Sequence, residues 1–535
     1  MKPRIIVLSG SVCSGKSTLA ALICKKADAK LAKTKTMLAE ISGKNITSRS
    51  VLQRTGTAIE KNSNGRWIAE HVSHLLYSDQ NLGLVVIDSA HTKEQVQSLR
   101  NGLWSVTHVH LEASDDVLDT RSDYDSLSSH AKKVEIKSRR SISSSKELSS
   151  VADVVIQTDR CNADDVYARV IARLEQRPVI SSPIIDILIG GQYGSEGKGN
   201  IAHYLAPEYD VLVRVGGPNA GHKVFRINNE PYTFRQLPSG ALGNKDAALV
   251  IGAGAVISVE TLTREISELS ITYDKLIIDP NAMIINENDV AWEKAELAAA
   301  IGSTAQGIGK ATARKIIGRK VGSDVLLAKD IPALRHYIRD TIDFFAECIS
   351  GSRKIMLEGT QGTSLSLHHG HYPHVTSRAT TAAACLAEAG LSARHVRKVV
   401  MVCRTYPIRV GDSHTGQTSG LMRSEITFEE ISRRSGVPLQ ELVTTEVGSV
   451  SHRPRRVAEF DWAQLRRSLL LNGPTDLALT FADYLGVDNR KAYRYGQLTE
   501  ETLRFIDELE KVSGISVSMI STAFNDRNII DRRMW

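Results

Sequence analysis

Short runs of apolar residues, each followed by a turn rich in glycine, open both halves of this chain. Residues 4–10 and 184–189 have the length and the β-branched content of buried strands. Helix-like periodicity follows the first run over residues 18–24, and further strand-like runs cover residues 84–88 and 211–215. Strands that alternate with helical segments predict parallel sheets covered by helices. The whole chain is therefore expected to have an α/β fold.

The alternation breaks near residues 175–183, where proline and serine replace the helix-like spacing. A chain of 535 residues is too long for a single hydrophobic core, so we expect more than one domain. The pattern predicts a front domain over residues 1–176, a linker over residues 177–184 and a larger domain over residues 185–535. No apolar run reaches the length of a membrane span, and residues 1–4 lead directly into the first strand, so we expect neither a membrane partner nor a signal peptide.

The first glycine-rich turn, residues 10–17, reads Gly-Ser-Val-Cys-Ser-Gly-Lys-Ser and fits the phosphate-loop pattern G-x-x-x-x-G-K-[ST]. In such a loop the backbone wraps the β-phosphate of a nucleoside triphosphate. Lys16 would contact the β- and γ-phosphates, and the Ser17 hydroxyl would bind Mg²⁺. Asp88, at the end of a predicted strand, would hold the same ion through water, unless it is only a strand-end cap. The predicted site comprises Gly10, Ser14, Gly15, Lys16, Ser17, Thr18 and Asp88.

Two more glycine-rich turns follow strand-like runs in the second half. They are residues 190–199, Gly-Gly-Gln-Tyr-Gly-Ser-Glu-Gly-Lys-Gly, and residues 216–223, Gly-Gly-Pro-Asn-Ala-Gly-His-Lys. A turn of this kind brings backbone N–H groups and a helix N-terminus to a phosphate, and Lys198 would add a positive charge for a transferring phosphoryl group. One such loop is weak evidence, because a tight turn beside a surface lysine gives the same pattern. Two in succession, with Asn219 and His222 on the second, favour a phosphoryl-transfer site.

These two loops resemble those of the adenylosuccinate synthetase family, and the resemblance extends over residues 184–535. Further matching stretches occur in the family's order: 301–309, 358–363 (Glu-Gly-Thr-Gln-Gly-Thr), 369–376, 452–456 (His-Arg-Pro-Arg-Arg) and 520–522. Members join L-aspartate to C6 of a purine nucleotide, driven by a nucleoside triphosphate and Mg²⁺. The resemblance implies a C–N ligase of purine nucleotide biosynthesis with a mostly parallel central sheet, which works as a homodimer.

The chemistry explains which groups such an enzyme needs. A purine 6-oxo group is amide-like and leaves poorly, so the γ-phosphoryl group is first transferred to O6, and the aspartate amine then displaces phosphate. By resemblance, the catalytic positions are Ser195, Lys198, His222 and Gln361, and those that bind the triphosphate are Gly194, Glu196, Gly197, Gly199, Gly221, Asp483 and Ser521. The mononucleotide would contact Asn219, Thr304, Gln361, Thr376 and Val410, and aspartate would contact Ser451, Arg453 and Arg455. Mg²⁺ would be held at Ser195 and the Gly221 carbonyl.

One departure from the family is sharp. Adenylosuccinate synthetases carry Asp as general base and metal ligand where this chain has Ser195. A hydroxyl is shorter, uncharged and a poor base, so inosine N1 would be deprotonated slowly, and space opens beside the N1–C2 edge of the purine. Phage-type 2-aminoadenylosuccinate synthases, which act on dGMP, have the same replacement. We therefore expect a guanine mononucleotide, GMP or dGMP, as acceptor. IMP with a displaced base such as Glu196, and an inactive pocket, remain open as alternatives.

The phosphoryl donor is also open, between ATP and GTP. In the family's guanine-reading segment Asp483 is retained, but Phe481 replaces a Lys, and Ala523 and Phe524 replace a Gly-Pro pair. These changes are either neutral drift or a changed base preference, with ATP in place of GTP. The family also reaches a phosphate across its dimer interface with an Arg, and Arg319 lies one position away from the match.

The front domain resembles P-loop nucleoside monophosphate kinases and dephospho-coenzyme A kinase in its layout. Arg49 and Arg54 would clamp an acceptor phosphate, unless they are solvated helix-surface residues. A serine-rich charged segment would form a mobile lid over the phosphates or a solvated basic helix. Its cations are Lys132, Lys133, Lys137, Arg139 and Arg140.

Composition adds limits to this interpretation. The net charge of +7 is mild for this length and forms no basic stripe, so we expect anionic nucleotides rather than a nucleic acid as partners. The six cysteines are scattered, which suits reduced thiols in the cytoplasm and argues against a zinc site. Histidines 368, 369, 371 and 374 are expected to line a pocket. Two classes of function stay open: an enzyme that combines a ligase with a nucleotide kinase, and a nucleotide sensor that has lost turnover.

Overall fold

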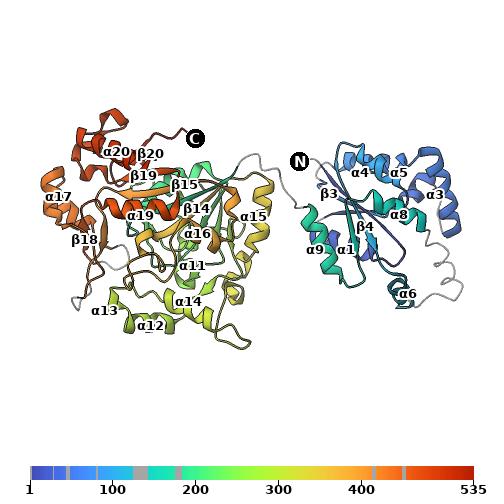
Figure 1. Ribbon diagram of the computed structural model, residues 1–535, viewed down its shortest axis with the longest axis horizontal. Helices are drawn as coiled ribbons and strands as arrows, with labels where there is room; N and C mark the ends of the chain where they lie inside the picture. The colour runs from blue at the N-terminus through green and yellow to red at the C-terminus, as the bar shows by residue number, and fades with distance from the viewer. Residues whose placement is uncertain are drawn as a thin grey trace. The chain divides into compact units, whose positions relative to one another are not determined.

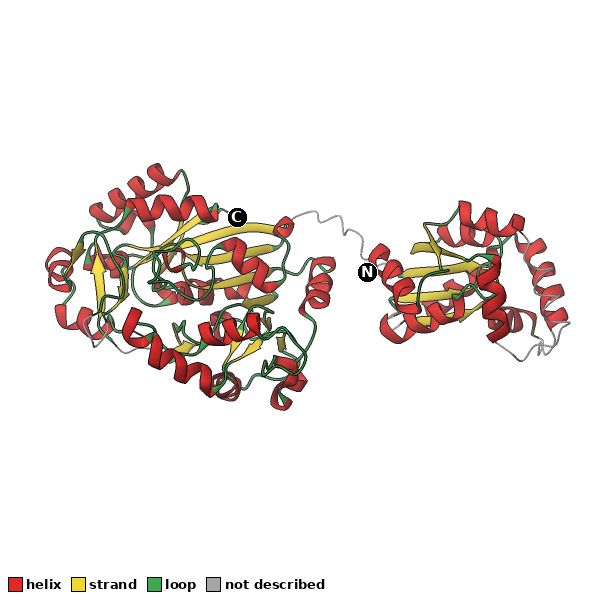
Figure 2. Cartoon of the chain, turned by 60° about the horizontal axis from the view of Figure 1, so that its bottom comes forward, coloured by secondary structure: helices red, strands yellow, loops and turns green. Residues whose placement is uncertain are grey.

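The computed structural model describes residues 3–27, 29–43, 49–79, 82–124, 142–174, 183–412, 417–448 and 453–534. The chain divides into two compact units, Met1–Arg177 and Pro178–Trp535 (Figure 1). Each unit has its own buried apolar clusters on the two faces of a central sheet. Helices and strands alternate in both, as the cartoon in Figure 2 shows. The predicted α/β class is therefore confirmed.

A five-stranded sheet with the order β2-β3-β1-β4-β5 forms the centre of the first unit. All its neighbouring strands are parallel, as the sequence predicted for this part of the chain. The strands are β1 (Arg4–Gly10), β2 (Lys30–Lys33), β3 (Leu84–Asp88), β4 (Ser105–Glu112) and β5 (Val154–Gln157). The phosphate loop leaves the middle strand β1, whose apolar run is completely buried from Ile5 to Leu8.

Alternate residues of β1 face two different helical layers. Ile5 and Val7 belong to a core shared with α2, α4 and α5, whereas Ile6 and Leu8 pack with α1 and α9. The helices of this unit are α1 (Lys16–Ala27), α2 (Thr34–Ser42), α3 (Arg49–Ser63), α4 (Arg66–Ser78), α5 (Lys93–Arg100), α6 (Asp115–Tyr124), α8 (Ile142–Ser150) and α9 (Ala163–Leu174). Burial on both faces explains why β1 is apolar throughout instead of alternating with polar residues.

The second unit has a nine-stranded sheet with the order β12-β10-β7-β14-β6-β15-β19-β20-β21, in which only β21 pairs antiparallel. Its strands are β12 (Leu276–Ile278), β10 (Ala248–Ile251), β7 (Val211–Arg214), β14 (Ile355–Gly362), β6 (Ile185–Gly190), β15 (Val396–Arg404), β19 (Asp476–Thr480), β20 (Val517–Ser521) and β21 (Ile529–Asp531). A mostly parallel central sheet was the expectation from the family resemblance, and it is confirmed.

Helices cover both faces of this sheet (Figures 1 and 2). The longer ones are α10 (Lys198–Leu205), α11 (Val259–Glu268), α12 (Glu287–Glu296), α14 (Ile308–Ile317), α15 (Thr341–Ser350), α16 (Ala382–Ala389), α17 (Phe428–Ser435), α18 (Leu439–Thr445), α19 (Trp462–Asn472) and α20 (Glu500–Ser513). Small sheets pair β8 (His222–Phe225) with β9 (Pro231–Phe234), β11 (Val256–Ile257) with β13 (Met283–Ile284), and β18 (Arg455–Ala458) with β16 (Ile408–Val410) and β17 (Glu425–Ile426).

The carboxyl ends of the parallel strands lie along one edge of the sheet, where ligands bind in open α/β folds. The two glycine-rich loops follow β6 and β7, and the ends of β14, β19 and β20 carry further predicted residues to the same edge. This topology gathers segments that are far apart in the sequence. Within the described residues, no helix combines the length and the apolar character that crossing a membrane requires.

Candidate functional site

One buried carboxylate holds the loop after β6 in shape. Glu196 is fully buried, and its Oε1 accepts hydrogen bonds from the backbone N–H groups of Gln192 (2.9 Å) and Gly194 (2.7 Å). Its Oε2 accepts from the Lys198 ammonium at 2.8 Å, and Lys198 also donates to the Gly194 carbonyl at 3.2 Å. Both oxygens of Glu196 are thus occupied by the loop itself. Lys198 is held at the first residue of α10.

His222 lies at the start of β8 and is oriented by a buried acidic residue. Its Nδ1 donates a hydrogen bond to Glu358 of β14, which also accepts from the backbone N–H of Ser239 at 2.7 Å. Burial lowers the pKa of His222 to about 4. Burial acts to raise the pKa of Glu358, but its contacts with His222 and Arg214 outweigh burial and hold this pKa at about 2. The imidazole Nε2 is buried without a hydrogen-bond partner among the described residues, so it is available to a ligand.

A cavity of about 210 Å³ lies where the two glycine-rich loops meet. The predicted residues in its lining are Gly194, Ser195, Asn219, Gly221, His222, Thr304, Gln361, Thr376, Val410 and Arg455. Among the described residues that line it, none is Asp or Glu. The described lining therefore offers amides, hydroxyls, two imidazoles and guanidinium groups, but no carboxylate.

Gln361 reaches this cavity from β14 and is fixed at both ends of its amide. Its Nε2 donates to the Asn219 side-chain oxygen at 2.8 Å, and its Oε1 accepts from the Thr360 hydroxyl at 2.9 Å. Arg378, which is paired with Glu388, donates to the same hydroxyl at 2.6 Å. This chain of contacts joins the end of β14 to the second glycine-rich loop and orients the amide in the cavity.

Close approach at Gly216 lets the second loop reach β14. Gly216 has a φ of +94°, and a β-carbon there would lie 2.2 Å from the Thr360 hydroxyl oxygen and 3.0 Å from the guanidinium of Arg378. Any side chain would push the loop away from the strand that carries Gln361. The glycine is therefore required by the geometry of the cavity.

A smaller cavity of about 70 Å³ shares part of this lining. Both cavities contain Gly194, Ser195, Gly221, His222 and Arg455, and the smaller one adds Gly197, Lys198, Gly199, Lys223, Thr445, Glu446, Val447, Phe481 and Phe524. Arg455 donates to the Glu446 carboxylate at 2.8 Å. Of the residues expected to hold a transferring phosphoryl group, His222 thus stands at the junction of the two cavities, and Lys198 lines the smaller one.

Aromatic rings form one wall of the smaller cavity. The rings of Phe481 and Phe524 stack with centroids 5.8 Å apart and planes inclined by 25°, and Phe225 meets Phe524 edge-on at 5.7 Å. Asp483 is 3% exposed and lines neither cavity; its Oδ2 accepts from Arg490 at 2.9 Å. Burial raises the pKa of the Asp483 carboxyl to about 6.

The remaining predicted residues of this unit lie near the cavities or apart from them. Arg453 donates to the carbonyl of Gly302, a lining residue of the larger cavity, at 2.6 Å. The Ser521 hydroxyl donates to the Ala523 carbonyl at 2.7 Å, close to Phe524. Arg319 lies on the surface and donates to the carbonyl of Ile316 at 2.6 Å. Ser451 lies outside the described residues.

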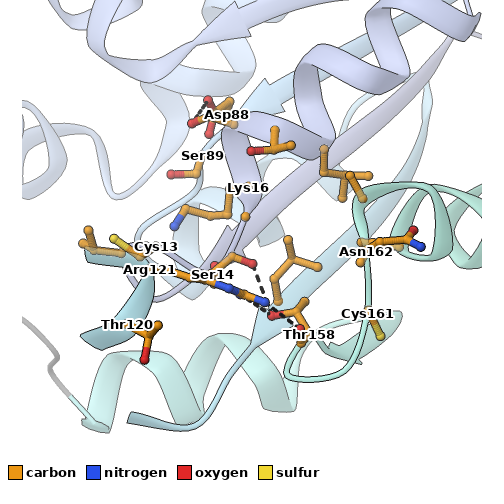
Figure 3. Close-up of a pocket in the computed structure, with 18 of the residues that line it drawn as sticks. Cys13, Ser14, Lys16, Asp88, Ser89, Thr120, Arg121, Thr158, Cys161 and Asn162 are labelled. Carbon is orange, nitrogen blue, oxygen red and sulfur yellow. Dashed lines mark hydrogen bonds between the residues drawn. The ribbon is translucent and has the colours of Figure 1, made fainter. Parts of the chain in front are cut away.

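In the first unit a cavity of about 700 Å³ surrounds the phosphate loop (Figure 3). Its lining includes Ser14, Gly15, Lys16, Ser17, Thr18 and Asp88. The Ser17 hydroxyl donates to the Asp88 carboxylate at 2.9 Å, and the Lys16 ammonium donates to the carbonyls of Gly10 (3.0 Å) and Ser11 (2.6 Å). Burial lowers the pKa of Lys16. The predicted loop, lysine, serine and acidic residue are thus brought together.

The lining of this cavity also contains a residue that the sequence analysis did not single out. Arg121 of α6 donates through one nitrogen to the Thr158 hydroxyl (3.0 Å) and through another to the Thr158 carbonyl (2.7 Å), as Figure 3 shows. Arg54 is exposed on α3, and nothing is described of the Arg49 side chain. The five cations of the expected lid lie outside the described residues.

Other side chains missed by sequence reasoning act on the predicted ones from a distance in the chain. Glu358 and Ser239 orient His222, Arg378 orients Gln361, and Glu446 binds Arg455. Glu358 lies inside a stretch that carried the family resemblance, but its contact with His222 spans 136 positions. No local pattern marks such a pair, because the contact depends on which strands become neighbours.

Comparisons with known proteins agree with this geometry. Residues 187–331 and 323–491 match the family model of adenylosuccinate synthetase, and residues 2–157 match that of adenylylsulphate kinase. The adenylosuccinate synthetase of Methanococcus aeolicus is 35% identical over 355 residues, which cover 65% of this chain and 99% of that protein. That of Pyrococcus horikoshii is 35% identical over 354 residues, covering 65% and 98%.

Two solved structures are similar to the second unit. One is the succinoaminodeoxyadenylate synthetase (PurZ) of cyanophage S-2L bound to dGMP and dATP as an energy donor, with 28% identity and a TM-score of 0.54, covering 66% of this chain and 96% of that one. The other is the fully ligated adenylosuccinate synthetase of Plasmodium falciparum, with 21% identity and a TM-score of 0.56, covering 66% and 100%.

The same comparisons refine the expectation for the first unit. Its motifs favour a nucleoside monophosphate kinase or dephospho-coenzyme A kinase layout, whereas the matching family model is that of adenylylsulphate kinase. A kinase-like P-loop domain is common to these descriptions. With this domain in front, the chain belongs to the adenylosuccinate synthetase family, the C–N ligases that join aspartate to a purine nucleotide.

Proposed function

We propose that the second unit ligates L-aspartate to C6 of a guanine mononucleotide, GMP or dGMP, through a 6-phosphoryl intermediate. The observation that carries this proposal is the lining of the larger cavity, in which no described residue has a carboxylate and Ser195 stands on the first glycine-rich loop. An aspartate at this position would meet the C2 amino group of guanine, whereas a serine leaves room for it. The hydroxyl can also accept a hydrogen bond from that amino group.

Glu196 is a poor candidate for a displaced general base. One oxygen is bound by two backbone N–H groups and the other by Lys198. Taking a proton from the purine N1 would require breaking these contacts in a fully buried position. This argues against the alternative in which IMP is the acceptor and Glu196 replaces the missing aspartate.

Phosphoryl transfer would take place at the junction of the two cavities. Lys198 would supply a positive charge to the γ-phosphoryl group. His222 lines the same smaller cavity, its Nδ1 is held by Glu358, and its Nε2, which has no partner among the described residues, would contact the phosphoryl group. Ser195 and Gly221 line both cavities, and a serine hydroxyl and a backbone carbonyl are hard oxygen donors of the kind that Mg²⁺ prefers. When bound, the ion would neutralise charge on the transferring phosphoryl group.

Aspartate would bind on the other side of this junction. Arg455 lines both cavities, and a planar guanidinium fork binds a carboxylate through two hydrogen bonds. Arg453 contacts the segment at Gly302 and would bind the second carboxylate. Ser451, which lies outside the described residues, stays a predicted contact of aspartate.

For the donor we propose an adenine nucleotide, ATP or dATP. The Phe481 and Phe524 rings offer stacking, which any base accepts, and Asp483 is engaged by Arg490 and lies outside the cavity lining. The phage enzyme, 28% identical, has dATP as its energy donor and dGMP as its ligand. This donor assignment is tested by comparing aspartate-dependent phosphate release with ATP, dATP and GTP at a fixed acceptor concentration. A preference for GTP would contradict the assignment.

The acceptor is tested by aspartate-dependent phosphate release with dGMP, GMP and IMP in parallel, with the product mass as a second readout. We expect turnover with a guanine mononucleotide and a product that carries the succinyl group at C6. Activity with IMP alone would refute the guanine proposal. Tight nucleotide binding without phosphate release from any acceptor would instead identify a nucleotide sensor.

The first unit is proposed to be a nucleotide-dependent kinase that transfers a phosphoryl group from a triphosphate held by the phosphate loop. The Ser17–Asp88 contact provides hydroxyl and carboxylate oxygens that fit Mg²⁺ beside Lys16. A (deoxy)nucleotide related to the ligase product is the acceptor class we favour. A screen of nucleoside monophosphates with the Lys16→Met variant as control tests it.

We also propose that the second unit self-associates as a homodimer in a reducing compartment such as the cytoplasm. Ile317 and Val321, at and just beyond the end of α14, are 81% and fully exposed, and none of the six cysteines, all of which lie among the described residues, forms a disulfide. Light scattering of the purified chain tests the assembly, and a monomer at micromolar concentration would contradict it.

A further inference from the structure

Arg404, the last residue of β15, is a buried guanidinium that contacts three walls of the smaller cavity. Only 1% of its surface is exposed. It is not among the described residues that line the cavity, but it contacts Ser195, Glu446 and Phe481, which are. Ser195 belongs to the first glycine-rich loop, Glu446 to the segment before Arg453 and Arg455, and Phe481 to the aromatic wall.

The contacts of Arg404 are specific. One terminal nitrogen donates to the Ser195 carbonyl at 3.3 Å, the other donates to the Glu446 carboxylate at 2.6 Å, and the guanidinium lies 3.8 Å from the centroid of the Phe481 ring. Its backbone is fixed as well, because the side-chain amide of Gln192 accepts from its N–H (3.0 Å) and donates to its carbonyl (3.1 Å). The side chain is thus anchored at its base and engaged at its end.

Glu446 connects Arg404 to Arg455. Its Oε1 accepts from Arg404 and from the Tyr484 hydroxyl (2.7 Å), and its Oε2 accepts from Arg455 (2.8 Å). Glu446 is 2% exposed, so its charge is compensated by these neighbours rather than by water. One carboxylate is therefore shared between two guanidinium groups, and a net positive charge remains on the side of Arg455 for an incoming carboxylate.

We propose that Arg404 is a positioning residue of the ligase. It sets the affinity for aspartate by sharing Glu446 with Arg455. Through its contacts with Ser195 and Phe481, it also holds the first glycine-rich loop and the aromatic wall in place beside Arg455. The inference rests on the proposed role of Arg455 in binding aspartate. Without Arg404, Glu446 would have Arg455 as its remaining guanidinium partner, and aspartate would have to compete with a more strongly held ion pair.

The test is steady-state kinetics of the full chain with whichever acceptor the wild type turns over. For Arg404→Met, which keeps the length but removes the charge, we expect the KM for aspartate to rise at least about tenfold, with a smaller change in the KM for the acceptor. Arg404→Lys keeps the charge and should return the aspartate KM to within about threefold of the wild type. A wild type without turnover on any acceptor would contradict the proposed function itself, before any variant is compared.

A matched control lies on the same strand. Arg397, near the other end of β15, binds the buried Asp186 through two nitrogens, away from both cavities. Arg397→Met should lower the Tm without changing the aspartate KM. The proposal would be overturned if Arg404→Met had a lower Tm but an aspartate KM within twofold of the wild type. That result would show that Arg404 contributes to stability alone.

A double variant keeps the proposal testable if Arg404→Met folds poorly. Arg404→Met with Glu446→Gln removes both buried charges, so neither is left unpaired, and Arg455 is released from the carboxylate. We expect this double variant to bind aspartate more tightly than Arg404→Met and to recover its Tm. An aspartate KM that is not improved, or failure of both variants to fold, would overturn the positioning role.

Discussion

At the scale of single residues, the polar groups of the candidate ligase site are each held by a second, buried residue. His222 depends on Glu358, Gln361 on Arg378, and Lys198 on Glu196. The groups that line the cavities could be predicted from the sequence, because glycine-rich loops and the family resemblance mark them. Glu196 lies on the same loop as Lys198 and was among these predicted residues, whereas Glu358 and Arg378 were not, since their contacts join segments that only the folded chain brings together.

The His222–Glu358 pair predicts that donor binding takes up a proton. Burial lowers the pKa of His222 to about 4, so its ring is neutral near neutral pH, with the Nδ1 proton donated to Glu358. Nε2 can donate to a phosphoryl oxygen only after it gains a proton, and the negative phosphate raises the pKa of the ring. Uptake should therefore grow as the pH falls from about 8 towards 6.

Calorimetric titration of the donor in two buffers of different ionisation enthalpy measures this proton count. The triphosphate itself also exchanges protons, so the informative quantity is the difference between the wild type and His222→Asn. We expect the wild type to take up more protons on donor binding than His222→Asn does. The difference should be a fraction of a proton and should increase at lower pH. Equal proton counts for the two proteins would rule out protonation of His222 on binding.

At the scale of the structural elements, the sequence pattern is sufficient to locate the strands that carry the loops. The predicted runs at residues 4–10 and 84–88 coincide with β1 and β3, and those at 184–189 and 211–215 differ from β6 and β7 by one residue. Continuous apolar runs identify strands that are buried on both faces. The order of the nine strands was beyond prediction, because neighbours such as β14 and β6 are separated by more than a hundred and fifty residues.

The close packing of the second glycine-rich loop on β14 predicts a large effect of Gly216→Ala. The new β-carbon would meet the Thr360 hydroxyl at 2.2 Å with the backbone at a φ of +94°. We expect a loss of more than about 2 kcal/mol in the stability of the ligase unit, followed by loss of turnover as Asn219 and His222 shift. Thermal unfolding followed by differential scanning calorimetry provides the measurement.

Gly473→Ala is the matched control for this variant. Gly473 also has a positive φ, +52°, but a β-carbon there would have no atom within 4 Å. Gly473→Ala should lower the stability of the ligase unit by only about 1 kcal/mol, because only the backbone conformation is strained. If the two variants lowered the Tm equally, the close approach of loop and strand would not be the cause.

At the scale of the whole molecule, the chain combines two α/β units, each with its own cores and its own cavity beside glycine-rich loops. In the proposed function, the phosphate loop of the first unit and the paired glycine-rich loops of the second would each hold a triphosphate independently. The break in periodicity before residue 184 is the sequence feature behind the predicted domain boundary, and the division into compact units falls at Arg177 and Pro178. What the first unit phosphorylates was not predictable, because motifs define the donor side of a kinase far better than its acceptor side.

If the two units have independent active sites, a substitution in one site should abolish only the activity of that unit. Lys16→Met should abolish nucleotide turnover by the kinase-like domain while leaving aspartate-dependent phosphate release within about twofold of the wild type, and His222→Asn should do the reverse. Both activities are measured on the same full-length preparations. Loss of both activities in either variant, with the Tm unchanged, would show that the two sites depend on one another.

The central claim is that a serine in place of the family's aspartate directs the ligase to guanine, and one measurement tests it most directly. That measurement is the ratio of kcat/KM for dGMP to kcat/KM for IMP, in the wild type and in Ser195→Asp. We predict that the wild type prefers dGMP by at least about tenfold, and that the carboxylate shifts the ratio towards IMP by about a hundredfold or more. A wild type that prefers IMP, or a ratio that does not change in Ser195→Asp, would contradict the account.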